Sequence, residues 1–164
     1  MDDSWISSYV EERTLDRFEL PPLKSALRGK DDLEVRIWEF SEFTQAIVIT
    51  RVDGTWAGQC GGKFKPLSDD PEKMVDDLSA PLSGWEDMWT KLTEQGLLTL
   101  PDDTQLEPSA ATGVRDGTSF VVELNVDGRY RTYHYLNPAW NPTPEAKKMI
   151  AIYELLKAEF AEVR

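Results

Sequence analysis

The sequence predicts an α+β fold: an antiparallel sheet of about five strands, paired in hairpins and covered by helices, in the order α-β-β-β-α-β-β-α. Asp53-Gly54 and Asp127-Gly128 each separate two runs rich in β-branched and aromatic residues, which is a strong short-range signal of a β-hairpin. Apolar residues recur at helical spacing in segments before, between and after these hairpins. The length of 164 residues fits a single domain, 1–164.

The first segment predicts a short helix over residues 2–13. Acidic residues open this segment, where the helix dipole favours negative charge, and its apolar residues follow at helical spacing: Trp5, Ile6, Tyr9 and Val10. Residues 14–32 contain Pro21-Pro22 among charged side chains and are expected to form a connection, with a helical turn at 23–27.

Three strands are expected next. Apolar and polar residues alternate over 33–38, and residues 44–52 form a second run with strand character. Asp53-Gly54 turns the chain into a third strand that starts at Thr55. This third strand contains three glycines, which predicts a bulge, a bend or a sheet edge at that position. The glycines are Gly58, Gly61 and Gly62.

The middle of the chain predicts two helices. Asp70-Pro71-Glu72 is a favourable helix start, and apolar residues follow it as far as Leu78. The second helix is expected to begin at the capping box Ser83-Gly84-Trp85-Glu86 and to end at Gly96 in a left-handed cap. Its apolar face is expected in the core: Trp85, Met88, Trp89 and Leu92.

The last part of the chain predicts a hairpin and a helix. Phe120 to Val126 and Arg129 to Leu136 flank the Asp127-Gly128 turn, and the segment from Asn137 to Pro142 ends the second strand. Thr143 is placed to cap a final helix, with proline in the first position. One apolar stripe runs along that helix: Met149, Ile152, Tyr153, Leu156, Phe160 and Val163.

Composition excludes several classes of partner. The formal net charge is −12, which argues against nucleic acid and against an anionic membrane, because both are bound by lysine and arginine. Apolar runs such as Ala46 to Ile49 are far too short to span a bilayer. Cys60 is the only cysteine, and no pattern of metal ligands or nucleotide-binding glycines occurs, so no metal and no cofactor is expected. The acidic start lacks the features of a secretory signal, which favours the cytoplasm.

One pair of residues has the geometry of a general base. If Asp127-Gly128 forms a two-residue turn, Glu123 and His134 become diagonal neighbours on one sheet face, with Tyr130 and Thr132 beside them. A carboxylate next to an imidazole can orient it for proton transfer. The other interpretation, which we favour from base rates, is a polar pair on a solvated sheet face.

An aromatic cluster with interspersed arginine is the second candidate site. Its residue types dominate the hot spots of protein interfaces, although aromatic residues are also ordinary strand formers on which arginine stacks. With the polar pair included, the candidate binding residues are Glu123, Tyr130, Arg131, Tyr133, His134, Tyr135 and Trp140.

Residues 85–156 resemble an uncharacterised group of bacterial domains. The resemblance rests on a series of residues: Trp85, Leu92, Leu100-Pro101-Asp102, Asp116-Gly117, Val122-Glu123, Tyr130-Arg131-Thr132-Tyr133, Tyr135 and Asn137-Pro138. That group has no established activity, so the resemblance implies no functional residues. The element order and acidity are also similar to those of type III secretion chaperones, which are small acidic dimers that hold unfolded effector segments.

Together these observations predict a non-enzymatic protein-binding domain, either chaperone-like or immunity-like, whose partner is another protein of basic character. A homodimer is compatible with the resemblance to secretion chaperones. The alternative is a small-molecule-binding or enzymatic domain that uses the sheet face around Glu123 and His134.

Overall fold

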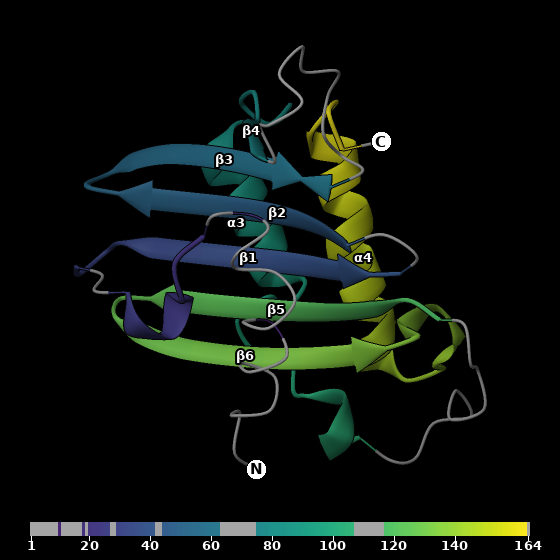
Figure 1. The fold of residues 1–164 in the computed structure, drawn as a ribbon. Helices are drawn as coiled ribbons and strands as arrows, with labels where there is room; N and C mark the ends of the chain where they lie inside the picture. The colour runs from purple at the N-terminus through teal and green to yellow at the C-terminus, as the bar shows by residue number, and fades with distance from the viewer. Residues whose placement is uncertain are drawn as a thin grey trace.

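A computed structural model shows a six-stranded antiparallel sheet with two α-helices on one face, in the part of the chain that it describes (Figure 1). The described residues are 10, 18, 20–26, 29–41, 44–62, 75–106 and 117–163. The strand order is β4-β3-β2-β1-β5-β6. The strands are β1 (Leu33–Phe40), β2 (Thr44–Val52), β3 (Thr55–Gly61), β4 (Val75–Asp77), β5 (Ser119–Val126) and β6 (Arg129–Leu136). The helices are α3 (Trp85–Glu94) and α4 (Pro144–Glu159). Short 3-10 turns lie at η2 (Leu23–Ser25), η4 (Asp103–Gln105) and η6 (Pro138–Trp140).

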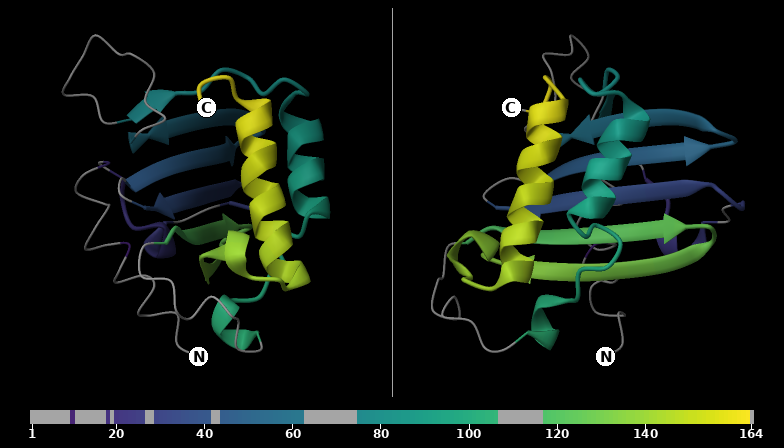
Figure 2. Two further views of the ribbon diagram at one scale, coloured as in Figure 1. Left: turned by 90° about the vertical axis from the view of Figure 1, so that its right-hand side faces the viewer. Right: turned by 180° about the vertical axis from the view of Figure 1, so that it is seen from behind.

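Both helices pack side by side on one face of the sheet, here called the helix face (Figure 2). Strand residues that point to this face alternate along the chain, so Val35, Ile37 and Val122 join the main core with Met88 of α3 and Ile152 of α4. Each of these five side chains is at most 2% exposed. The predicted α+β class is therefore confirmed, with six strands instead of about five.

The hairpin of β5 and β6 forms in the predicted register. Asp127 and Gly128 take positive φ angles of 52° and 77°, as a two-residue turn between twisted strands requires, and Val126 pairs with Arg129. Glu123 then pairs with Thr132, so the predicted set of residues does share the sheet face opposite the helices. We call that face the opposite face.

The predicted helix from Asp70 to Leu78 is wrong in its described part. Residues 70–74 lie outside the described residues, but Val75–Asp77 form strand β4 on the edge of β3. The glycine in β3 explains the pairing, because a Cβ on Gly58 would lie only 3.3 Å from Leu78 and 2.9 Å from the indole of Trp85. The backbone N–H of Leu78 donates to the Gly58 carbonyl at 2.8 Å, which draws this segment into the sheet.

Helix α3 forms as predicted, but its start differs from the predicted capping box. Gly84 occupies the N-cap position with no side-chain hydrogen bond. Ser83 instead bonds to Glu159 of α4, and the Glu86 carboxylate accepts from the indole N–H of Trp56 at 2.8 Å. These long-range partners outcompete the local cap. Gly96 ends the helix at a φ of 96°, as predicted.

The two tryptophans of α3 pack against the core without being fully buried. Trp85 and Trp89 are partly exposed, whereas Met88 and Leu92 are inaccessible. Trp85 stacks on Trp56 of β3 with ring centroids 5.8 Å apart and planes only 3° from parallel. The tryptophans thus close the edge of the core instead of filling its centre.

Helix α4 begins as predicted, since the Thr143 hydroxyl accepts from the backbone N–H of Ala146 at 3.3 Å. Its apolar stripe is buried, and Phe160 and Val163 continue the core beyond the last helical residue, Glu159. The predicted turn after Pro22 is present as η2. The predicted helix 2–13 lies outside the described residues except for Val10, which is buried.

Candidate functional site

Three of the predicted binding residues form hydrogen bonds to the backbone of the segment that follows α3. The Tyr133 hydroxyl donates to the carbonyl of Leu97 at 2.8 Å, and the Tyr135 hydroxyl donates to that of Pro101 at 2.8 Å. The guanidinium of Arg131 lies over the Tyr133 ring at 4.9 Å and donates to the Leu98 carbonyl at 2.9 Å. All three side chains lie on the helix face.

Tyr133 and Tyr135 are buried and have a structural role. Each is at most 1% exposed, and burial raises the pKa of both phenols above the ordinary range. For Tyr133 the positive charge of Arg131 opposes that rise, and for Tyr135 the carboxylates of Glu145 and Asp103 add to it. Both phenols therefore stay neutral and act as hydrogen-bond donors to backbone carbonyls.

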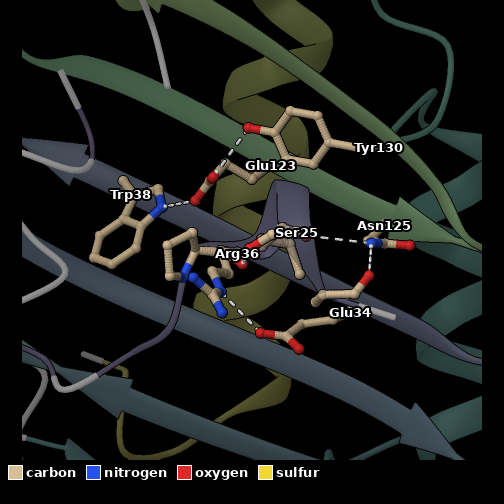
Figure 3. Close-up of polar contacts among 10 residues, drawn as sticks. Ser25, Glu34, Arg36, Trp38, Glu123, Asn125 and Tyr130 are labelled. Carbon is tan, nitrogen blue, oxygen red and sulfur yellow. Dashed lines mark hydrogen bonds and ion pairs between the residues drawn. The ribbon is translucent and has the colours of Figure 1, made fainter. Parts of the chain in front are cut away.

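Glu123 lies in a polar cluster on the opposite face (Figure 3). Its two carboxylate oxygens accept from the Trp38 indole N–H at 2.7 Å and from the Tyr130 hydroxyl at 3.1 Å. Glu123 and Thr132 are each only 4% exposed, so the expected solvated face is wrong here. Apolar side chains on this face form a second, smaller core, in which the Phe18 ring meets that of Trp38 edge-on at 5.4 Å.

Buried charge continues along β1 beside Glu123. Arg36 is 1% exposed, and its Nε donates to Glu34 at 2.8 Å (Figure 3). Burial lowers the pKa of this guanidinium, while the nearby charge of Glu123 and the phenol of Tyr130 raise it. The amide nitrogen of Asn125 donates to two carbonyls of the η2 segment, at 3.0 and 3.2 Å. This cluster fastens the chain before β1 onto the sheet.

His134 has different partners from Glu123. The two residues are diagonal neighbours in the register, as predicted, but Nδ1 of His134 lies 3.4 Å from Asp103. The backbone N–H of His134 donates to Asp102 at 2.9 Å, and that of Leu136 donates to Asp103 at 2.6 Å. Because β6 is an edge strand, these carboxylates cap two of its outward amides. The carboxylate beside the imidazole is thus that of Asp103 and not the predicted Glu123, and the same two aspartates protect the sheet edge.

Among the predicted binding residues, Trp140 is the one that is largely exposed to solvent. It ends η6, and its side chain is 70% exposed. The turn that carries it starts at Asn137, which takes a left-handed φ of 48° and is only 2% exposed. The side chain of Asn137 occupies the space beside Gly117 where a Cβ would stand, which fixes the approach of the two segments. Leu136, just before the turn, is 44% exposed.

Two hollows adjoin Trp140. The first, the proline hollow, has a volume of about 590 Å³ and is mostly apolar, with Pro138, Pro142 and Ile150 in its wall and Lys147 as its basic residue. The second, the glutamate hollow, has about 260 Å³ and has Glu39 and Glu154 in its wall. Trp140 and Pro138 belong to both hollows. We call Trp140 with its two hollows the Trp140 surface.

The glutamate hollow combines carboxylates with aromatic rings. The Tyr153 hydroxyl donates to Glu39, which is 7% exposed, and the rings of Phe120 and Tyr153 have centroids 4.8 Å apart. Burial and the hydrogen bond to Glu39 raise the pKa of Tyr153. Glu154 pairs with Lys157 at 2.7 Å. No basic side chain lines this hollow within the described part of the chain.

Sequence reasoning identified Trp140 but not Glu39, Asn137 or Tyr153. Tyr153 belongs to the apolar stripe of the last helix, and it lies 114 positions from Glu39 in the sequence, so no local pattern joins the two residues. A partial signal for Asn137 was present, since asparagine tolerates the left-handed conformation better than most residues do.

Cys60 is buried in β3. Burial raises the pKa of its thiol to about 12, and the carboxylates of Asp76 and Glu162 add to the effect. Among the described residues, no group of three or more histidine, cysteine, aspartate or glutamate side chains is placed to hold a metal ion. None of the described helices is long and apolar enough to cross a membrane.

Comparison with protein-family models, curated proteins and solved structures finds no match to this chain. The resemblance of residues 85–156 to a bacterial domain group stays a prediction. Function therefore has to be inferred from the Trp140 surface and the charge of the chain.

Proposed function

We propose that the chain is a non-enzymatic protein-binding domain and that the Trp140 surface binds a basic protein. The observation that carries the proposal is Trp140 itself, a tryptophan with 70% of its side chain in solvent, set between two hollows. Tryptophan is among the residues most enriched in interface hot spots, and an adjoining hollow supplies the pocket that a partner's side chain fills.

Charge supports a basic partner. The net charge is −12, which steers a positively charged protein toward this one and repels acidic proteins. Near Trp140, two acidic residues, Glu39 and Glu154, lie in the wall of the glutamate hollow. Lys147 in the proline hollow is the exception, so the basic group of a partner fits the glutamate side of Trp140 better.

The contacts of Glu123 and His134 also favour binding over catalysis as the function of this domain. The two hydrogen-bonding groups that sequence suggested for proton transfer, Glu123 and His134, bond to Trp38, Tyr130 and the η4 segment instead of to each other. A ligand site on the sheet face around Glu123 requires an open face, and Glu123 is 4% exposed.

Affinity capture with three forms of the immobilised protein tests the proposal: the original, Trp140→Ala and Leu82→Ala. Leu82 is the matched control, because it is 79% exposed and its backbone contacts Glu159 at the other end of α4. We expect one stoichiometric basic protein from the host lysate, released at moderate salt and held by the original and Leu82→Ala forms. Trp140→Ala should weaken its retention at least about thirtyfold, the effect of losing a hot spot of about 2 kcal/mol.

Retention of the same proteins by all three forms contradicts the proposal, and so does an acidic partner that salt does not release. Size-exclusion chromatography supplies a separate check. A dimer that Trp140→Ala dissociates identifies the surface as a self-association interface and also overturns the proposal. A folded basic partner indicates the immunity-like form of the function, and a partner held unfolded indicates the chaperone-like form.

A further inference from the structure

We propose that another hollow, at the turn end of the β5–β6 hairpin, binds a small organic carboxylate with an apolar body. This hollow, here called the hairpin hollow, lies on the helix face beside the segment that follows α3 and has a volume of about 430 Å³. The residues in its wall are Leu98, Leu124, Val126, Asp127, Arg129 and Arg131. None of them belongs to the Trp140 surface, so this site is separate from the proposed protein-binding function.

The register of the hairpin places two arginines beside apolar side chains. Arg129 pairs with Val126 across the hairpin. Two positions along the strand, Arg131 pairs with Leu124 on the same face. Alternate residues of one strand are about 7 Å apart, so two long guanidinium side chains can converge on one ligand over this hollow.

Neither guanidinium forms an ion pair with a carboxylate among the described residues. The ion pairs in that part of the chain belong to other cations, namely Arg36, Arg51, Lys91, His134 and Lys157. The sequence contains 30 acidic and 18 basic residues, so carboxylates are abundant. Two arginines that remain without one, side by side at a hollow, leave positive charge for an anionic ligand.

Arg131 is held in place before a ligand arrives. Its Nη1 donates to the Leu98 carbonyl at 2.9 Å, and its Nη2 donates to that of Leu100. The guanidinium also lies over the Tyr133 ring at 4.9 Å. All these contacts are with neutral groups, so they orient the positive charge without cancelling it and leave further N–H groups for a ligand. A side chain that is already ordered loses little conformational entropy on binding.

The size and chemistry of the wall favour a carboxylate with an apolar body. A volume of about 430 Å³ lies in the usual range of small-molecule sites, about 300–1,000 Å³. Leu98, Leu124 and Val126 offer aliphatic surface to the body of the ligand. A carboxylate matches the planar fork of a guanidinium in geometry. It also carries less negative charge than a phosphate, and is therefore repelled less by a chain of net charge −12.

Asp127 is the acidic residue in the wall, and it opposes an anion. Its Oδ1 accepts from the backbone N–H of Asp31 at 2.8 Å, which leaves its negative charge in place. Asp127→Asn removes that charge and keeps an acceptor oxygen. Asparagine also suits the positive φ of 52° at this turn position, since Asn-Gly is a favoured hairpin turn. This variant should therefore fold and bind the carboxylate more tightly.

The test uses three probes: hexanoate, the uncharged hexanamide of similar shape, and acetate, which has the charge but almost no apolar body. Binding to the full chain at pH 7 and constant ionic strength is followed by NMR shifts of the backbone amides of Leu98 and Val126, both in the wall. We expect saturable binding of hexanoate with a Kd of about 1 mM. Hexanamide lacks the charged hydrogen bonds and should bind at least about tenfold more weakly. Acetate lacks the methylenes and should also bind at least about tenfold more weakly.

Variants assign the binding to the hairpin hollow. Arg129→Gln should weaken hexanoate about three- to fivefold, because an exposed ion pair is lost. Asp127→Asn should strengthen it about twofold. Lys148→Gln, a matched loss of positive charge at an exposed position on α4, should leave the Kd unchanged. Arg129 is exposed, so its replacement should leave the fold intact.

Equal binding of hexanoate and hexanamide overturns the inference, and so does the absence of saturable shifts at Leu98 and Val126. It also fails if Arg129→Gln weakens hexanoate no more than Lys148→Gln, or if Asp127→Asn weakens it. Shifts confined to Ala139 would place the ligand in the proline hollow and would contradict the hairpin hollow as its site. Capture of a basic protein through Trp140 is independent of all these results, so the proposed function and the carboxylate site can fail separately.

Discussion

The buried carboxylate of Glu159 connects α4 to α3 and to Ser83 shortly before that helix, and its replacement tests this connection most sharply. It accepts hydrogen bonds from the N–H and the hydroxyl of Ser83, both at 2.8 Å, and from Nζ of Lys91 at 2.9 Å. Glu159 is 6% exposed, whereas the Lys91 side chain is 47% exposed, so the bonds to Ser83 carry most of the energy. The perturbation we propose is Glu159→Gln, which keeps the size but removes the charge.

The expected loss follows from these three contacts. A net hydrogen bond to a charged group contributes about 1.5–3 kcal/mol, and the half-exposed ion pair adds less than about 1 kcal/mol. Glutamine retains one acceptor oxygen for Ser83, so the bonds are not all lost. We therefore expect the free energy of unfolding to fall by about 2–3 kcal/mol. With a urea m-value near 2 kcal/mol/M, the unfolding midpoint falls by about 1–1.5 M.

The pH dependence has a defined sign. Burial alone would raise the pKa of Glu159, but the bonds from Lys91 and Ser83 outweigh it and hold the pKa below its ordinary value. A lowered pKa contributes stability above the unfolded-state pKa, and that stability is lost as pH falls through the folded-state value. The gap between the original protein and Glu159→Gln should therefore be constant near neutral pH and shrink under acid conditions.

Urea unfolding by circular dichroism measures this gap, with Glu154→Gln as the control. Glu154 lies on the same helix, is 60% exposed and pairs with Lys157 in an i, i+3 arrangement, so its replacement should cost less than about 0.5 kcal/mol. Equal effects of the two variants, or a gap that grows as pH falls, would refute the reasoning.

Three further predictions concern the core and the surface. Tyr133→Phe leaves the carbonyl of Leu97 without its donor and should lower the free energy of unfolding by about 1–2 kcal/mol in the same urea assay, whereas no change would mean that the bond is dispensable. Cys60 should react with a thiol reagent at pH 8 only as fast as the protein unfolds, because the thiol is buried and its pKa is raised to about 12; rapid labelling of the folded protein would contradict this. Moderate salt should raise the Tm by screening the excess negative charge, and a flat or falling Tm would show that the acidic residues are already paired.

Local patterns predicted the parts of the fold that short-range forces determine. The Asp127-Gly128 turn set the register of β5 and β6, because a two-residue loop leaves one pairing that matches the alternation of side chains. Gly96 and Thr143 marked helix ends for the same local reason. Where an element depends on a distant partner, prediction failed. Val75–Asp77 is a strand because β3 offers it an edge and Gly58 leaves room for Leu78.

In the candidate site, too, local sequence predicted some residues and missed those that depend on distant contacts. Residue types alone pointed to Trp140, and the structure places it in solvent. They could not separate it from Tyr133 and Tyr135, whose hydroxyls bond to a segment more than 30 positions away in sequence. Glu39 was missed because its neighbours in the hollow come from β5, η6 and α4. The burial of Glu123 depends in part on side chains before β1 that pack across the opposite face.

Site-specific photo-crosslinking tests the central claim, binding of a basic protein at the Trp140 surface, most directly. A photoreactive benzoylphenylalanine replaces Ala139, exposed beside Trp140, in one form of the protein and the exposed Leu82 in a control form. After irradiation in the host lysate, we predict that one basic protein is crosslinked through position 139 in a one-to-one complex. The same protein should not be crosslinked through position 82. Crosslinks through position 82 alone, or only to acidic proteins, would contradict the account.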